Sequence, residues 1–307
     1  MDLPDDPVGG DRFFAGLRLR SEVPLPELPA WTGGHRLPDL IIEKGPVPEE
    51  LPNAVFHRPL LQVGADGACR FAIDGVAAWW IAPDGSRIVM AMAGADQAPM
   101  RTFLFGTVFA IVLVRHGLLP LHACCLERDG QAIAISGDSG AGKSTLAAQL
   151  IGRGYRILSD DLTVVDMRSG DVPLALPTFP RIKLWQDMLD HLEIEAAGLE
   201  RVRSELAKYN LPVPSAFCAE PRPIRHLLYL DNDMVEPGRT HRRLAPAESL
   251  NNIATILYRQ QMVLRLGLTG WQMTQYLRLL SAVGGCTAIR RPETPAALDE
   301  LLSSIPR

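Results

Sequence analysis

The sequence predicts an α/β fold in which a strand-rich N-terminal domain, residues 1–100, precedes a nucleotide-binding domain, residues 101–307. Two observations support this prediction. Short alternating runs separated by Pro and Gly turns fill the first hundred residues, a pattern typical of antiparallel strands and hairpins. Beyond residue 130, a strand, a glycine-rich loop, a helix and a further strand follow one another in the order of an α/β core.

The N-terminal domain is expected to contain strands at 17–23, 60–64, 69–74, 77–82 and 86–93. No residue pattern typical of catalysis occurs there. The adjacent pair Trp79-Trp80 is interpreted as one core aromatic and one partly covered aromatic, in preference to a platform on which a ligand stacks.

The C-terminal domain is expected to alternate helices with strands. Helices are predicted at 101–115, 143–153, 183–192, 246–260, 271–282 and from Thr294-Pro295 onward, and strands on both sides of the turn 128–130, at 155–161, in DLTVVD (161–166), at 224–231 and at 286–291. Residues 207–223 are expected to be irregular because they are rich in proline.

Composition excludes several classes of protein. A net charge of −4 gives no basic field, so nucleic acid is not expected as a partner, and the clusters 241–243 and 290–291 are interpreted as solvated surface. The apolar run 103–114 is too short to span a bilayer and predicts a buried core helix, hence a soluble protein. Five scattered cysteines without a CxxC pair, and an N-terminus unlike a secretory signal, favour a reduced cytoplasmic location.

The segment AIAISGDSGAGKSTLAAQL contains a phosphate-binding loop of the form G-x-x-x-x-G-K-[ST]. Its glycines allow the backbone to approach phosphate oxygens, and the following helix N-terminus attracts the anion. The lysine is expected to contact the β- and γ-phosphates and the serine to bind Mg²⁺, which implies ATP with Mg²⁺. The predicted nucleotide-binding residues are Gly137, Asp138, Ser139, Gly140, Ala141, Gly142, Lys143, Ser144 and Thr145.

Two adjacent carboxylates, Asp160 and Asp161, end the strand predicted after the loop. Because neighbouring residues of a strand point to opposite sides, both cannot be ordinary core residues. Beside a phosphate site, one carboxylate can serve Mg²⁺ and the other can accept a proton. A solvated turn explains the pair equally well when it is taken alone.

These motifs together resemble the HPr kinase/phosphorylase family and its relatives, the HPr-kinase-like serine kinases. The resemblance covers about residues 120–166: a histidine at the start of a strand (His122), the loop, the segment Arg153-Gly154-Tyr155-Arg156, and Asp160-Asp161. It implies a P-loop kinase core in which Asp160 is the general base and Lys143 binds the phosphates. It also implies that Asp161 and His122 orient the base and the metal, with Ser144 and Asp161 on Mg²⁺.

The sequence also departs from the bifunctional enzymes of this family. Thr145 stands where they usually carry Glu, and PTFPRIKLW (177–185) replaces the L-E-x-R-G signature. The segment PRIKLW (180–185) and the stretch LRSEVPLPEL (19–28) resemble a divergent branch that includes kinases of lasso-peptide and other peptide-modifying systems. Arg181, Lys183 and Arg259 are cationic candidates for contact with phosphate or substrate, with surface or structural roles as the alternative.

The resemblance implies an ATP-dependent kinase acting on a serine hydroxyl of a peptide or small protein. Two alternatives stay open: a kinase of free hydroxy amino acids, which present the same nucleophile, and a regulator that hydrolyses ATP slowly. Asp160 separates the kinases from the regulator, because a pure switch needs no base aimed at an acceptor. The sequence leaves the acceptor and the oligomeric state open, with a homo-oligomer among the alternatives.

Overall fold

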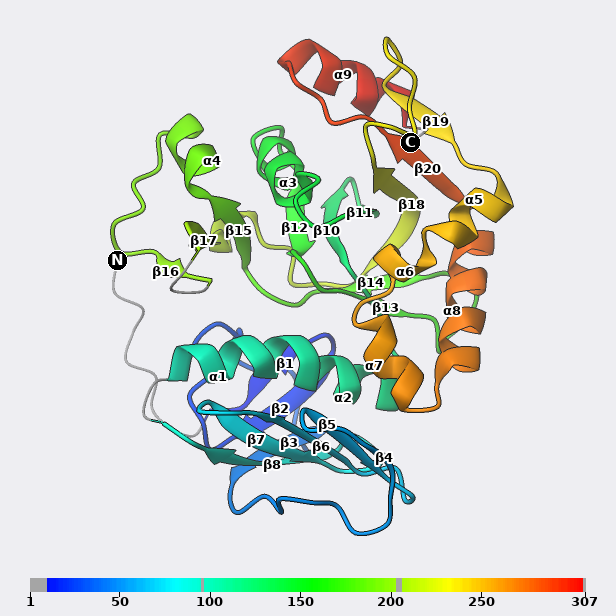
Figure 1. Ribbon diagram of the computed structural model, residues 1–307. Coiled ribbons are helices and arrows are strands. Elements are labelled where there is room, and N and C mark those ends of the chain that lie inside the picture. Colours follow the sequence, from blue (N-terminus) through cyan, green and yellow to red (C-terminus); the bar gives the residue numbers. More distant parts are fainter. Residues whose placement is uncertain (1–9, 95–96, 203–205, 306–307) are drawn as a thin grey trace. The chain divides into compact units, whose positions relative to one another are not determined.

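The computed structural model describes residues 10–94, 97–202 and 206–305 (Figure 1). The chain forms two compact units, one containing residues 1–118 and 259–272 and the other residues 119–258 and 273–307. The domain boundary predicted after residue 100 falls inside the helix Gln97–Phe103, and the chain up to Leu118 groups with the first unit.

The first unit contains a sheet with the strand order β1-β2-β3-β8-β7-β6-β5-β4 (Figure 1). Its strands are β1 (Arg12–Phe14), β2 (Leu17–Ser21), β3 (Leu40–Lys44), β4 (Ala54–His57), β5 (Leu61–Gly64), β6 (Cys69–Ile73), β7 (Ala77–Ile81) and β8 (Arg87–Met92). The predicted strands correspond to β2, β5, β6, β7 and β8. Trp79 is fully buried and Trp80 partly exposed, which confirms their interpretation.

Antiparallel strands were expected for this sheet, but the sheet is mixed. β3 pairs in parallel with both β2 and β8. Parallel neighbours need a crossover connection, and residues 22–39 provide it between β2 and β3. This segment is anchored by its buried side chains Val23, Leu25 and Leu28.

A continuous helical segment lies across one face of this sheet (Figure 1). It consists of α1 (Gln97–Phe103), the π-helix η1 (Leu104–Val108) and α2 (Phe109–Arg115), so it begins earlier than predicted. By length and composition alone the segment could cross a membrane, but most of it is buried within the unit. Phe109 packs on Phe14 of β1 with ring centroids 4.7 Å apart, as expected of a core helix. The unit also includes α7 (Gln260–Arg265).

The second unit contains a sheet whose strand β11 leads into the phosphate loop. Its strand order is β12-β10-β11-β18-β14-β13-β9, with β20 beside β18 and β19 beside β20. Its strands are β9 (Leu119–Leu121), β10 (Ala123–Arg128), β11 (Gln131–Gly137), β12 (Arg156–Ser159), β13 (Thr163–Asp166), β14 (Leu174–Leu176), β18 (Arg222–Leu230), β19 (His241–Arg243) and β20 (Cys286–Ile289). β11, β18 and β20 are parallel neighbours. Their carboxyl ends therefore meet at one edge, where ligands of open α/β sheets bind.

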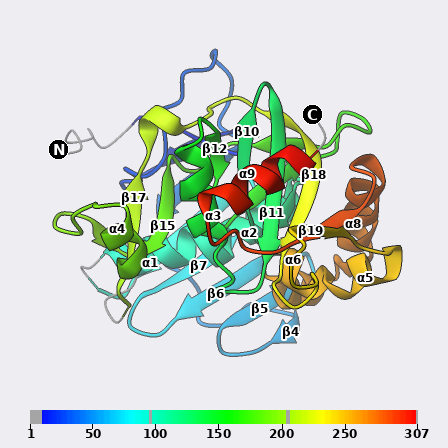
Figure 2. The ribbon, with the colours of Figure 1, turned by 90° about the horizontal axis from the view of Figure 1, so that it is seen from above.

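Helices cover both faces of this sheet. α3 (Lys143–Ile151) and α9 (Pro295–Ser304) lie on one face (Figure 2), where their apolar side chains share one cluster. The other face packs on α6 (Ile253–Ile256) and the part of α8 (Thr269–Ala282) that belongs to this unit. α5 (Pro246–Asn251) precedes α6, and Thr294 caps α9 as predicted by accepting a hydrogen bond from the Ala297 amide.

A separate small sheet with the order β15-β17-β16 replaces two sequence predictions. β15 (Arg181–Trp185) occupies the start of the helix predicted at 183–192, and only α4 (Gln186–His191) is helical there. β17 (Lys208–Pro212) and the 3-10 helix η2 (Pro214–Ala216) lie in the stretch predicted to be irregular, and β16 (Glu200–Arg201) completes the sheet. The strand forms because burial alternates along it: Ile182 and Leu184 are buried against α3 and α4, while Arg181, Lys183 and Trp185 are not fully buried.

Candidate active site

The phosphate loop connects β11 to α3 through three glycines with left-handed backbone angles. The φ angles are +147° at Gly137, +88° at Gly140 and +101° at Gly142. Gly137 pairs with Leu230 of β18, and a Cβ at Gly137 would lie 2.6 Å from the Leu230 carbonyl oxygen. The first glycine of the motif is therefore required by the neighbouring strand as well as by its own backbone angle.

Gly137→Ala is expected to lower both thermal stability and ATP affinity, because the new methyl group must displace the backbone of β18. We expect a free-energy cost of about 1–3 kcal/mol from overpacking, added to the strain of the left-handed angle. Gly154→Ala is the matched control, since Gly154 has a φ of +86° but nothing within 4 Å of its added Cβ. Thermal unfolding and calorimetry of ATP binding would contradict this expectation if both variants behaved alike.

Lys143 is the first residue of α3, and its side chain is buried inside the loop. Its ammonium donates hydrogen bonds to the carbonyl oxygens of Gly137 at 2.8 Å and Asp138 at 3.0 Å. It also lies 3.1 Å from Nε2 of His122. Burial lowers the pKa of Lys143, although its neighbouring carboxylates oppose the shift.

His122 lies between β9 and β10, where backbone contacts hold it in place. Its amide donates to the Ile256 carbonyl at 2.7 Å, and its own carbonyl accepts from the Ser136 hydroxyl at 2.8 Å. Burial and the positive charge of Lys143 lower the pKa of His122, which favours the neutral ring. Since an ammonium only donates, Nε2 accepts and the proton lies on Nδ1, which faces the Asp161 carbonyl oxygen at 3.3 Å.

The two carboxylates lie beyond β12, which ends at Ser159, so the strand predicted to reach Asp161 stops earlier. Asp161 has a φ of +71°, a left-handed angle that Asp tolerates better than most residues. The pair thus sits in a turn, and the expectation that the two side chains point to opposite sides of a strand was wrong. Asp160 is buried and Asp161 is partly exposed.

Asp160 contacts the phosphate loop directly. The Ser144 hydroxyl donates to Oδ1 of Asp160 at 2.9 Å and to Oδ2 at 3.1 Å. Burial and the charge of Asp161 raise the pKa of Asp160. Asp161 behaves in the opposite way: although burial opposes the shift, Lys183 and His122 hold the pKa of Asp161 well below its usual range. Adjacent carboxylates therefore have different electrostatic environments, a feature typical of functional sites.

Lys183 of β15 joins this group; from the sequence, contact with phosphate or substrate and a surface or structural role were both open for it. Its backbone amide donates to Asp160 Oδ2 at 2.7 Å and its ammonium to Asp161 Oδ2 at 2.8 Å. The alternation of buried residues in PRIKLW was the available signal, but a helix was predicted to start at Lys183. Of the other cationic candidates, Arg181 lies over the Phe179 ring at 4.9 Å and Arg259 belongs to the first unit.

The remaining loop residues are less enclosed. Asp138 accepts a hydrogen bond from Thr255 of α6 at 3.2 Å, Ala141 packs on the cluster of α3 and α9, Ser139 is exposed and Thr145 is partly exposed. Arg291 follows β20, and a Cβ at Gly142 would lie 2.9 Å from its Cδ. Arg291 was expected on solvated surface; it is exposed, and it adds positive charge beside the loop.

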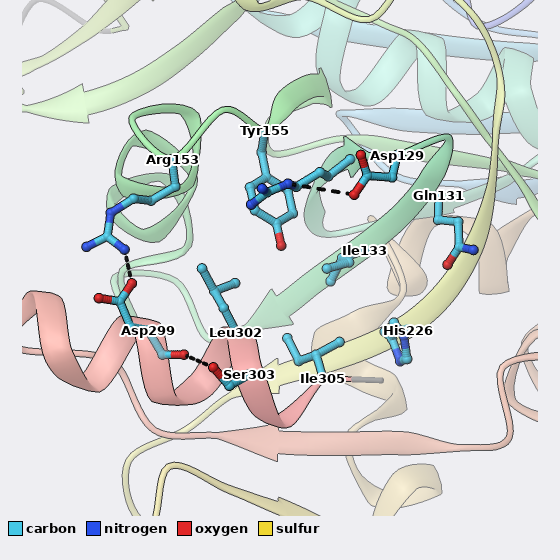
Figure 3. Close-up of a pocket in the computed structure, with 11 residues that line it drawn as sticks. Asp129, Gln131, Ile133, Arg153, Tyr155, His226, Asp299, Leu302, Ser303 and Ile305 are labelled. Carbon is cyan, nitrogen blue, oxygen red and sulfur yellow. Dashed lines mark hydrogen bonds and ion pairs between the residues drawn. The ribbon is translucent and has the colours of Figure 1, made fainter. Parts of the chain in front are cut away.

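A hollow of about 670 Å³ opens at the other end of β11, away from the loop (Figure 3). Arg128 lies over the Tyr155 ring at 5.4 Å and pairs with Asp129, and Arg153 pairs with Asp299 of α9. These arginines are thus engaged by partners of their own unit. The site predicted from the sequence lies instead at the carboxyl ends of the parallel strands.

No protein-family model matches the chain. The HPr kinase/phosphorylase of Treponema pallidum is 33% identical over 118 residues, which are 38% of this chain and 33% of that protein. The enzyme of the same name from Nitrosomonas europaea is 32% identical over 97 residues, 32% of this chain and 26% of that protein. The matches thus span about a third or less of these relatives. The solved structure of the Hpr(Ser) kinase/phosphatase from Coxiella burnetii aligns with a TM-score of 0.32 at 13% identity, over 60% of this chain and 93% of that chain. Over the matched residues the chain is similar to HPr kinase/phosphorylases, and this similarity supports an HPr kinase-like family.

Proposed function

We propose that the chain is a cytoplasmic ATP-dependent kinase that phosphorylates a serine hydroxyl on a peptide or small protein. The observation that supports this most directly is the contact between Ser144 of the phosphate loop and Asp160. This contact brings a carboxylate with a raised pKa next to the loop that would hold the phosphates of a bound nucleotide. A regulator that only binds ATP would not need such a carboxylate beside the loop.

The loop fits the phosphates of ATP, and the adjacent side chains fit Mg²⁺. The three left-handed glycines allow close approach to phosphate oxygens, and Lys143 provides a buried cation. A serine hydroxyl and a carboxylate form the donor set that P-loop proteins present to Mg²⁺, together with phosphate oxygens and water, and the pair proposed here is Ser144 and Asp161. Among the residues that the structure describes, no cluster of three or more His, Cys, Asp or Glu could hold a metal ion without the nucleotide. Mg²⁺ would neutralise negative charge on the transferring phosphoryl group.

In the proposed reaction, the acceptor serine oxygen forms a bond to the γ-phosphorus as the bond between that phosphorus and the ADP oxygen breaks. The hydroxyl proton passes to Asp160, the carboxylate beside Ser144 whose pKa is raised by burial and by the charge of Asp161. Lys143 stabilises the β- and γ-phosphates, and His122 and Asp161 form a polar network that keeps the site aligned. Asp161 stays ionised beside Lys183 and is the carboxylate proposed, with Ser144, for the metal.

We further propose that the acceptor is a serine in a flexible peptide or exposed loop, and not HPr. By the family resemblance, Thr145 stands where the bifunctional enzymes usually carry Glu. The PRIKLW strand stands in place of their L-E-x-R-G signature. Acceptor choice depends on surfaces outside the shared core, because transfer requires the hydroxyl to be held in line with the γ-phosphate.

The acceptor prediction is tested by incubating the chain with labelled ATP, Mg²⁺ and, separately, HPr, free serine and serine-containing peptides. Labelled phosphoserine in the peptides is expected, and Lys143→Ala serves as the inactive control. Efficient labelling of HPr, or of free serine alone, would refute the peptide acceptor while leaving a kinase in place. ATP hydrolysis without labelling of any acceptor would favour the regulator.

A further inference from the structure

Lys183 is bonded to both carboxylates of the site through two different atoms. The backbone amide binds Asp160 at 2.7 Å and the side-chain ammonium binds Asp161 at 2.8 Å. Each carboxylate keeps a second contact: Asp160 also accepts a hydrogen bond from Ser144, and Asp161 Oδ1 lies 3.4 Å from His122 Nδ1. One residue therefore connects the loop side of the site to the histidine side.

The position of Lys183 is set by the register of the small sheet. β15 pairs with β17 so that Lys183 lies opposite Asn210, between the buried residues Ile182 and Leu184. A shift by one residue would turn these apolar side chains to solvent, so the strand is held strongly in register. The side chain of Lys183 is 24% exposed and reaches Asp161 from this rigid element.

Asp161 needs such an anchor because its backbone angle is rarely populated. Its φ of +71° is sparsely occupied by residues other than glycine, and surrounding contacts must stabilise it. An ion pair with Lys183 and the proximity of His122 provide these contacts. Because of this left-handed turn, the consecutive residues Asp160 and Asp161 can both bind Lys183.

We propose that Lys183 is the positioning residue that holds the Asp160-Asp161 pair in its working arrangement, an inference that rests on the kinase function proposed above. It touches neither nucleotide nor acceptor in this role. Its amide orients Asp160 toward Ser144, and its ammonium fixes Asp161 beside His122. Removal of the side chain should release Asp161 and leave Asp160 anchored, because the backbone amide remains.

The test compares Lys183→Met, Lys183→Arg and Lys208→Met in the full chain. Lys208 is the control for loss of positive charge without the contact, because its charge also lowers the pKa of Asp161 while its ammonium lies 5.5 Å over the Trp185 ring on the adjacent strand. We expect Lys183→Met to lower kcat roughly 10–100-fold, the usual effect of losing a partner that orients a functional carboxylate, with unchanged KM for ATP. Lys183→Arg should recover part of kcat, because it restores a cation with N–H donors, and Lys208→Met should stay close to the unmodified chain.

Three results would overturn the proposal: full kcat in Lys183→Met, equal losses in Lys183→Met and Lys208→Met, or a crystal structure of Lys183→Met in which Asp161 has not moved. If Lys183→Met does not fold, Lys183→Gln replaces it, since its shorter neutral side chain also loses the ion pair. Full kcat in Lys183→Gln would likewise refute the role. If the unmodified chain phosphorylates no acceptor, the kinase proposal fails, and the position of Asp161 in the crystal structure decides the role of Lys183.

Discussion

Replacement of Lys143 by alanine is expected to abolish phosphoryl transfer and to weaken Mg-ATP binding. Lys143 is a buried cation inside the loop, where its ammonium already contacts the Gly137 and Asp138 carbonyl oxygens. A hydrogen bond to a charged group is worth about 1.5–3 kcal/mol, which corresponds to roughly 10–100-fold in affinity. Calorimetry of Mg-ATP binding and a transfer assay with labelled ATP measure the two effects separately.

Lys44→Ala is the control for the loss of a lysine, because Lys44 is exposed on β3 of the first unit. A thermal melt should accompany both variants, since Lys143 also binds carbonyl oxygens of the loop. Unchanged ATP affinity with full turnover in Lys143→Ala would refute the phosphate-loop assignment. If Lys44→Ala also lost ATP binding and transfer, the loss would be attributed to the protein preparation and not to Lys143.

Asp160→Asn is expected to retain ATP affinity within a few-fold while transfer falls by roughly 10²–10⁴, the usual contribution of a positioned base. The amide oxygen of asparagine can still accept from Ser144 and from the Lys183 amide, so the local geometry should persist. What is lost is a group that takes the proton of the acceptor hydroxyl. Single-turnover transfer and ATP calorimetry, carried out in parallel, separate chemistry from binding.

Magnesium dependence distinguishes the two carboxylates. Asp161→Asn and His122→Ala are expected to change the Mg²⁺ concentration needed for half-maximal rate, while Asp160→Asn leaves it near the original value. Recovery of Asp160→Asn at high Mg²⁺ would place Asp160 on the metal, which its contact with Ser144 would then explain. Near-normal turnover of Asp160→Asn at ordinary Mg²⁺ would move the base elsewhere and favour the regulator.

Consecutive residues determined the phosphate loop and the elements around it. The apolar run of β11, the three glycines and Lys143-Ser144 lie within one short stretch, so the strand-loop-helix unit follows from local backbone preference alone. The strands β5 to β8 were predictable for the same reason, because alternation and turn residues act over a few positions. The individual roles of His122, Asp160 and Asp161 could be assigned only through the family resemblance, since a lone histidine and an acidic pair are ambiguous by themselves.

The tertiary structure alone decided how distant segments meet at the site. Lys183 reaches the carboxylates because PRIKLW pairs with β17, and that pairing depends on burial of Ile182 and Leu184 against α3 and α4, which no local pattern specifies. The parallel pairing of β3 and the place of Arg291 beside Gly142 likewise depend on long connections between strands. Local backbone preference is set by neighbouring residues, whereas strand register and the proximity of distant segments are set by which apolar faces are buried together. The sequence by itself therefore determined the loop, and the tertiary structure determined what surrounds it.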